Sequence, residues 1–267
     1  MTFHHERRLD RALYHLESFK AERAAWREES PHRYWTEFDA ESGKKVIWAQ
    51  VLKPPPTSLS LIAGDCIHNL RASLDNLAFE LALAGTEGPL SRKVEGASGF
   101  PIFHKDPTKD PNLGPLRRFK GMIEGIDERA KTIIEGLQPY HRANGFRSDR
   151  LWQLNALENI DKHRLPHAAI LNNLSTLSFF EPAGITIEEI ESLFAFFDES
   201  APIAQYPAFD STGAEVRVDF RAAFDVCFSK GVPDRLLGNS ILGTLEGFHR
   251  YITTTVLPPL REFLTRY

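Results

Sequence analysis

The sequence has few cysteines and no long apolar run. Its two cysteines, Cys66 and Cys227, lie far apart, so they make neither the spacing of a metal site nor a disulfide framework. A run of about 18 apolar residues, which a membrane-spanning helix needs, is absent. The N-terminal residues also lack the apolar segment of a secretory signal peptide, and we therefore expect a cytoplasmic protein with no membrane contact.

An excess of basic charge is absent too. The formal net charge of −4 argues against a strongly basic nucleic-acid surface, although a local basic patch is compatible with it. The Gly-x-x-x-x-Gly-Lys phosphate loop, the Gly-x-Gly-x-x-Gly turn and the Gly-x-Ser-x-Gly elbow do not occur. These absences argue against the common ATPase, Rossmann and serine-hydrolase classes, and we expect no cofactor.

The composition is that of a globular protein, with 42% hydrophobic and 25% charged residues. Apolar residues recur at helical spacing in five segments, four of which are followed by proline or glycine, while Pro258 and Pro259 lie inside the fifth. These predicted helices cover residues 5–28, 58–84, 115–137, 148–164 and 240–264. Alternating apolar residues on both sides of a Gly-containing turn predict a β-hairpin over 33–52.

The apolar pattern changes after Pro166. Alternation predicts strands over 167–181 and 214–228, while the stretch from Ile185 to Phe197 suits a helix. We therefore predict a mostly α, α+β protein, in which a helical bundle core carries an N-terminal β-hairpin and a C-terminal β-rich insertion.

The predicted organisation is one structural domain with two parts. Residues 1–166 and 240–267 form the helical core, which includes the hairpin at 33–52. Residues 167–239 form the β-rich segment, which packs on that core.

The predicted helix over 58–84 combines an apolar face with polar flanks. Its large apolar residues fall within one arc of about 80°, which is the core face: Ile67, Leu70, Leu74, Leu77 and Leu81. An adjoining flank carries His68, Arg71 and Asp75, and the next flank carries Asp65 and Asn69. Charges at the edge of a buried face must be paired or hydrogen-bonded, because an unpaired buried charge is very costly.

A second polar helix has the same character. It ends in Asn159, Asp161, His163 and Arg164, after the apolar residues of Leu151-Trp152-Gln153-Leu154. We expect the two helices to meet, with any chemistry located between them.

Four motifs in this order resemble a widespread group of uncharacterised bacterial and phage proteins. The motifs are Gly64-Asp65-x-x-His68-Asn69-Leu70-Arg71-x-x-Leu74-Asp75-x-Leu77, then Phe100-Pro101-Ile102-Phe103, then Leu137-Gln138-Pro139-Tyr140, then Asn159-x-Asp161-Lys162-His163-Arg164. The resemblance covers about residues 60–165 and implies no particular activity.

A weaker resemblance is to HEPN-type helical domains of ribonuclease toxins, defence proteins and nucleotide-binding partners. In those domains an Arg-polar-x-x-x-His segment lies at the active cleft, and Glu158-Asn159-Ile160-Asp161-Lys162-His163 is similar to it. The resemblance implies His163 as acid/base and Asn159 as its orienting partner. Glu158 replaces the arginine that would stabilise phosphate charge, and Arg71 or Arg164 would have to substitute for it.

Three functions are open. In the first, the polar residues of the two helices form a structural network that locks these helices in register, and the protein is an interaction or sensing module. In the second, these residues form a metal-independent ribonuclease or nucleotide-binding site, in which histidine moves a proton and arginine holds phosphate. The candidate catalytic residues are His163, His68, Arg71, Asn159 and Arg164, and the supporting polar residues are Asp65, Asn69, Asp75 and Asp161.

In the third, Asp65 and His68 at i, i+3 ligate a metal ion with Asp75, or with Asp161 or His163. Asp161 and His163 lie about 200° apart on one helix, so they cannot share an ion, and no metal ligand is assigned.

RNA or a nucleotide is a candidate partner, and apolar helix faces predict a homodimer. We interpret Arg117, Arg118 and Lys120 as the charged start of a helix and His104 as a loop residue.

Overall fold

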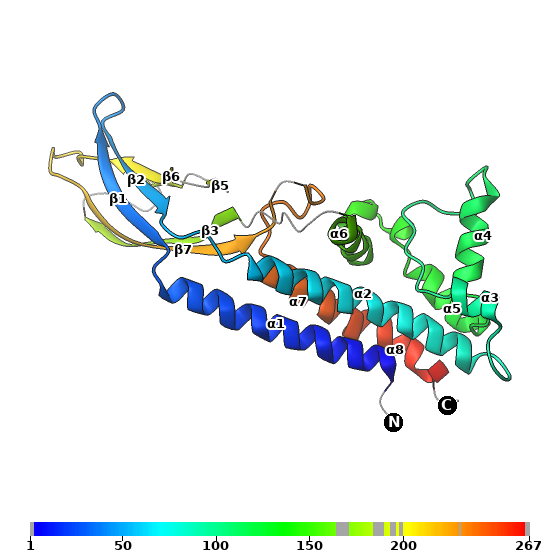
Figure 1. Cartoon of the computed structure of the whole chain (residues 1–267). Helices are drawn as coiled ribbons and strands as arrows, with labels where there is room; N and C mark the ends of the chain where they lie inside the picture. The colour runs from blue at the N-terminus through cyan, green and yellow to red at the C-terminus, as the bar shows by residue number, and fades with distance from the viewer. Residues whose placement is uncertain are drawn as a thin grey trace.

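Two long antiparallel helices form the axis of the protein, α1 (His4–Glu28) and α2 (Ser58–Ala84), which lie side by side (Figure 1). The computed structural model describes residues 3–163, 171–183, 190–192, 196–197, 200–229 and 231–264. Leu16 and Phe19 of α1 and Leu70 and Leu74 of α2 are fully or almost fully buried in one apolar core. The heptad-like apolar spacing of both segments therefore produces the helices predicted for them.

Further helices pack on this pair. The helix α6 (Arg150–His163) lies against the middle of α2, with Leu151, Leu154 and Leu157 in the core. The C-terminal helical stretch runs along the pair as four consecutive elements: α7 (Ile241–Tyr251), a π-helical turn (Ile252–Val256), α8 (Leu257–Leu260) and the 3-10 helix η5 (Arg261–Leu264). Pro258 and Pro259 have no N–H to donate to the preceding turn, which explains the widened turn before α8.

The region predicted as one helix over 115–137 is two helices, so that prediction is wrong. They are α4 (Leu113–Met122) and α5 (Glu128–Gly136), and Gly125 between them has a φ of +85°. Gly85, at the end of α2, also faces this turn, because a Cβ there would lie 2.3 Å from the carbonyl oxygen of Gly125. The close backbone contact therefore fixes where the chain must break.

Short helices surround this region. They are α3 (Arg92–Ala97) and the 3-10 turns η1 (Pro139–His141) and η2 (Phe146–Ser148). The helices α3, α4 and α5 lie at the end of α2 that is far from the sheets (Figure 1). In the part of the chain described, no helix is both long and apolar enough to cross a membrane.

The predicted hairpin is β1 (His32–Asp39) and β2 (Lys44–Val51), with Trp35 opposite Trp48. It belongs to a sheet of order β1-β2-β6-β4, in which β6 is Ser200–Pro207 and β4 is Glu191–Ser192. A second sheet has the order β5-β3-β7 and consists of Phe196–Phe197, Leu171–Ala183 and Arg217–Cys227. Phe224 stacks on His32 with ring centroids 4.4 Å apart, so the two sheets share an apolar core.

The mostly α, α+β fold is confirmed, and β3 and β7 match the strands predicted over 167–181 and 214–228, of which residues 167–170 lie outside the described residues. The helix that suited Ile185 to Phe197 is wrong for the described residues there, which form β4 and β5. The division into a helical core and a β-rich segment stays a prediction. The structure adds that the hairpin pairs with β6 of that segment.

Candidate functional site

Arg71 and Asp75 of α2 hold the backbone of Phe100. Their side chains form an i, i+4 ion pair of 2.9 Å, which the spacing of one helical turn allows. The Asp75 carboxylate accepts a hydrogen bond from the Phe100 nitrogen at 3.0 Å. The Arg71 guanidinium donates to the Phe100 carbonyl oxygen at 2.9 Å. Both polar backbone groups of Phe100 are therefore bound by side chains that lie one helical turn apart.

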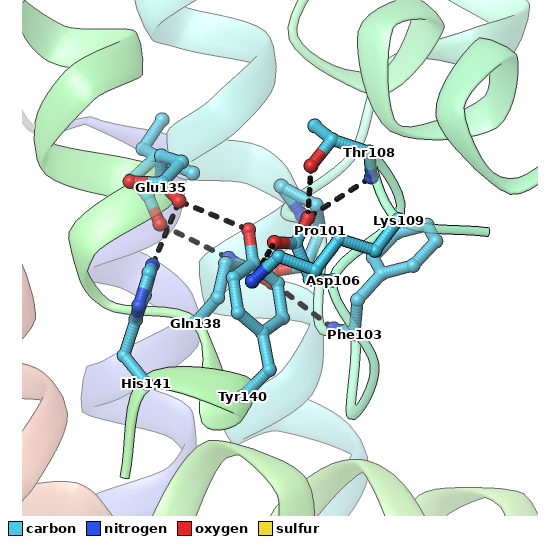
Figure 2. A network of polar contacts seen from close by, with 10 residues as sticks. Pro101, Phe103, Asp106, Thr108, Lys109, Glu135, Gln138, Tyr140 and His141 are labelled. Atoms are coloured by element: carbon cyan, nitrogen blue, oxygen red, sulfur yellow. Dashed lines mark hydrogen bonds and ion pairs between the residues drawn. The ribbon is translucent and has the colours of Figure 1, made fainter.

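Gln138 holds the other half of the same segment. Its amide oxygen accepts from the Phe103 nitrogen at 3.0 Å, and its amide nitrogen donates to the Pro101 carbonyl at 2.8 Å (Figure 2). The same nitrogen also donates to the Ile134 carbonyl of α5 at 3.0 Å, and the residue is fully buried. We call the side chains of Arg71, Asp75 and Gln138 the clamp, because together they fix the extended segment Phe100–Phe103.

Gly99 allows the close contact between the Asp75 carboxylate and the Phe100 backbone. A Cβ on Gly99 would lie 3.1 Å from the Asp75 carboxylate oxygen and 3.4 Å from the Met122 side chain. The first of these contacts would be tighter than an ordinary van der Waals contact. The absence of a side chain at this position lets Asp75 reach the Phe100 nitrogen.

Glu135 orders the chain that follows the clamp. Its carboxylate accepts from the Tyr140 hydroxyl at 3.1 Å and lies 2.7 Å from the His141 ring nitrogen (Figure 2). Burial, with a further contribution from Glu135, raises the pKa of Tyr140. Tyr140 therefore stays a neutral donor at physiological pH.

His68 joins α2 to α6, as the meeting of the two polar helices predicted. Its Nδ1 lies 3.1 Å from a carboxylate oxygen of Glu158, which is 2% exposed. The His68 side chain itself is half exposed. Glu158 occupies the position at which HEPN-type domains carry arginine, and here it is a buried hydrogen-bond partner of His68.

Arg71 lies among several charges. Burial lowers the pKa of its guanidinium, Asp75 and then Glu158 act in the opposite direction, and Arg118 of α4 lowers it further. Arg118 is exposed and forms no ion pair within the described part of the chain. Two guanidinium groups thus approach the same space from α2 and α4.

That space is a pocket of about 440 Å³, which we call the clamp pocket. The clamp contributes Arg71 to its wall, and α6 contributes Asn155 and Asn159. The remaining wall comes from the clamped segment, from the residues that follow it and from α4: Ile102, Phe103, His104, Lys105, Pro107, Asp110, Pro115, Arg118 and Met122. Of the predicted site residues, the pocket brings together Arg71 and Asn159.

Two predicted residues of α2 lie elsewhere. Asn69 is buried on the α1 side, where it accepts from Arg8 at 3.2 Å and donates to the Asp65 carbonyl at 2.8 Å. Asp65 is exposed, and its charge acts on His15 of α1. Neither residue supports the clamp, because both lie on the flank next to α1.

Arg164 and the side chains of Asp161 and His163 lie outside the described residues. Among the residues described, no three His, Cys, Asp or Glu side chains form a group that could hold a metal ion. Asp65 and His68, the proposed metal pair, face different neighbours, since His68 binds Glu158.

Several residues of the site were missed by sequence reasoning. The sequence presents Gln138 only as part of a motif, Arg118 as part of the charged start of a helix and His104 as a loop residue. A glutamine between a helix and Pro139 is one signal that could have indicated the role of Gln138, because a side-chain amide can satisfy both polar groups of a neighbouring extended backbone.

The comparisons of this chain with protein families, with curated proteins and with solved structures find no match, so both resemblances stay predictions.

Proposed function

We propose that the protein is a ligand-binding, sensing module in which the polar motifs form a structural clamp. The observation that carries this proposal is the use of the motif side chains. Arg71, Asp75 and Gln138 bind the backbone of one extended segment. A buried segment without secondary structure needs such partners for its N–H and C=O groups. The clamp therefore has a structural task that accounts for these residue types.

The sensing role rests on the double position of Arg71. It binds Phe100 and also lines the clamp pocket, whose far wall is α6. A ligand that accepts a hydrogen bond from the Arg71 guanidinium would weaken or strengthen the hydrogen bond from this group to the Phe100 carbonyl. Because the segment Phe100–Phe103 leads into the residues before α4, ligand binding would change the position of α4.

The ribonuclease function is the second candidate. Arg71 and Asn159 line one pocket, which is the observation in its favour. Against it, Glu158 replaces the arginine and is occupied by His68. A carboxylate at this position would repel the phosphate that arginine is expected to stabilise.

The experiment compares wild type with Arg71→Ala and His163→Ala, with melting temperature and RNA cleavage measured on the same samples. We expect Arg71→Ala to lower the melting temperature by several degrees and no form to cleave RNA. Asp65→Ala is the matched control, since it removes an exposed charge from the same helix. Cleavage by wild type that disappears in a normally folded His163→Ala would contradict the proposal and support the ribonuclease. The predicted homodimer is tested on the same samples by light scattering.

A further inference from the structure

We infer that the clamp pocket binds a small ligand that carries a phosphate group, with Arg118 and Lys105 as its principal electrostatic contacts. The inference rests on the proposed binding function and names the class of ligand for the same site. It assigns binding roles to Arg118 of α4 and to Lys105 of the segment before α4. Neither residue belongs to the clamp.

The first step is the balance of charge in the pocket wall. The wall contains the cations of Arg71, Lys105 and Arg118 and the single carboxylate of Asp110. Asp110 accepts a hydrogen bond from the backbone nitrogen of Asn112 at 2.8 Å. A chain with a net charge of −4 has thus gathered three cations around one small space, which attracts anions.

The second step is that two of these cations are uncommitted. Arg118 and Lys105 are exposed and form no ion pair with any residue that the structure describes. Surface cations usually repel each other, and Arg118 already lowers the pKa of the buried Arg71 guanidinium. An anion between them would relieve this repulsion and gain charge-assisted hydrogen bonds.

The third step is that Arg71 is rigid and still has donors. Its guanidinium is fixed by the Asp75 ion pair and by the Phe100 carbonyl. A guanidinium has five N–H donors, so these two partners leave others for a ligand. A preorganised cation costs little conformational entropy when a ligand binds.

The fourth step concerns the size and the other walls of the pocket. Its volume of about 440 Å³ suits a small molecule. Asn155 and Asn159 lie one turn apart on α6, and amides of this kind bind polar edges of a ligand. Phe103, Pro115 and Met122 add apolar surface. A phosphate beside a compact organic group, as in a nucleoside monophosphate, matches these walls better than a long polyanion, which needs an extended basic surface.

The test uses the full chain at low ionic strength, because surface electrostatic binding is screened by salt. Calorimetry measures binding of adenosine monophosphate, of inorganic phosphate and of adenosine, which lacks the phosphate. We expect one molecule of the monophosphate per chain, weaker binding of phosphate and no binding of adenosine. Arg118→Gln and Lys105→Gln should each weaken the monophosphate about tenfold, as loss of a charge-assisted contact does.

Arg117→Gln is the matched control. Arg117 precedes Arg118 on α4 and lines a different pocket, so the same charge is removed without removing a contact of the clamp pocket. We expect its affinity to stay within about twofold of wild type. Equal losses in Arg117→Gln and Arg118→Gln would overturn the inference, because they would show general attraction to the surface.

Two other results would also overturn it. One is the absence of monophosphate and phosphate binding up to about 10 mM. The other is binding of the monophosphate that neither Arg118→Gln nor Lys105→Gln weakens. These failures are distinguishable from failure of the proposed function, because the melting of Arg71→Ala and the RNA cleavage assay report on the clamp without any added ligand.

Discussion

Asp75 accepts a hydrogen bond from the backbone nitrogen of Phe100 at 3.0 Å, while lying 2.9 Å from the Arg71 guanidinium. One carboxylate thus pairs a largely buried cation and satisfies an amide of a segment that has no strand or helix to satisfy it. This double use explains why the two charges lie one turn apart on α2. It also makes the clamp a cooperative unit, because removal of either side chain leaves the other with an unmet partner.

The first prediction concerns Asp75→Ala. We expect the free energy of unfolding to fall by about 2 kcal/mol, because the Arg71 charge and the Phe100 amide both lose a partner. The half-exposed position of Asp75 keeps the loss below that of a fully buried pair. Urea denaturation measures it, with Asp65→Ala as the control on the exposed flank. A loss within about 0.5 kcal/mol of the control would show that the ion pair has no structural task.

The second prediction concerns Gln138→Glu, which replaces a donor to two carbonyls by an acceptor. We expect a loss of about 2 kcal/mol at neutral pH, because a carboxylate oxygen would face the Pro101 and Ile134 carbonyls. The site would raise the pKa of the new carboxyl in the folded state above its ordinary value of about 4.3. The folded protein would then bind more protons, so the loss should shrink as pH falls towards that value.

The control for this variant is Gln153→Glu. Gln153 is a partly exposed amide of α6, whose nitrogen donates to one carbonyl, that of Arg147, at 3.0 Å. Its substitution should have a small effect with little dependence on pH. Denaturation curves of both variants near neutral pH and in mild acid make the comparison. Parallel pH profiles for the two would refute the assigned role of Gln138.

The third prediction concerns Gly85→Ala at the end of α2. A Cβ at this position would lie 2.3 Å from the Gly125 carbonyl oxygen, which is backbone and cannot rotate away. We expect a loss of about 2 kcal/mol from overpacking. Gly136→Ala is the control, because no atom lies within 4 Å of its Cβ position. Thermal denaturation should therefore show a lower melting temperature for Gly85→Ala than for Gly136→Ala, and equal stability would refute the close contact.

The fourth prediction concerns alkaline pH. Burial raises the pKa of the Cys66 thiol from 9.0 to about 12. The folded protein therefore keeps a proton that the unfolded chain loses above pH 9, so stability falls as pH rises from there. The contribution of Cys66 should be about 1 kcal/mol by about pH 10. Denaturation at several pH values should give a shallower slope for Cys66→Ala than for wild type, and an unchanged slope would contradict the assignment.

The helices were predictable where one periodic apolar face is long. The predicted range 58–84 coincides with α2, and 5–28 differs from α1 by one residue at its start. The range 115–137 failed, because the break between α4 and α5 depends on Gly125, whose turn contacts Gly85 some 40 positions earlier in the chain. A contact between distant segments leaves no periodic signal in either of them.

The site was predictable in part for the same reason. The pairing of Arg71 with Asp75 follows from helical spacing. At the start of α6, the Asp149 carboxylate accepts hydrogen bonds from the Leu151 and Trp152 nitrogens. The partner of that pair, the Phe100 backbone, comes from a separate segment and has no side-chain signature. Arg118 gives no signal in the sequence either, because its approach to Arg71 depends on the position of α4 relative to α2.

The most direct test of the clamp is hydrogen exchange at the Phe100 and Phe103 amides, measured by nuclear magnetic resonance in wild type, Asp75→Ala and Gln138→Ala. In wild type both amides should be protected, because each donates to a clamp side chain. Asp75→Ala should raise the exchange rate of the Phe100 amide about tenfold more than that of the Phe103 amide. Gln138→Ala should raise the exchange rate of the Phe103 amide more than that of the Phe100 amide. Amides that exchange as fast in wild type as in the two variants would contradict the clamp itself.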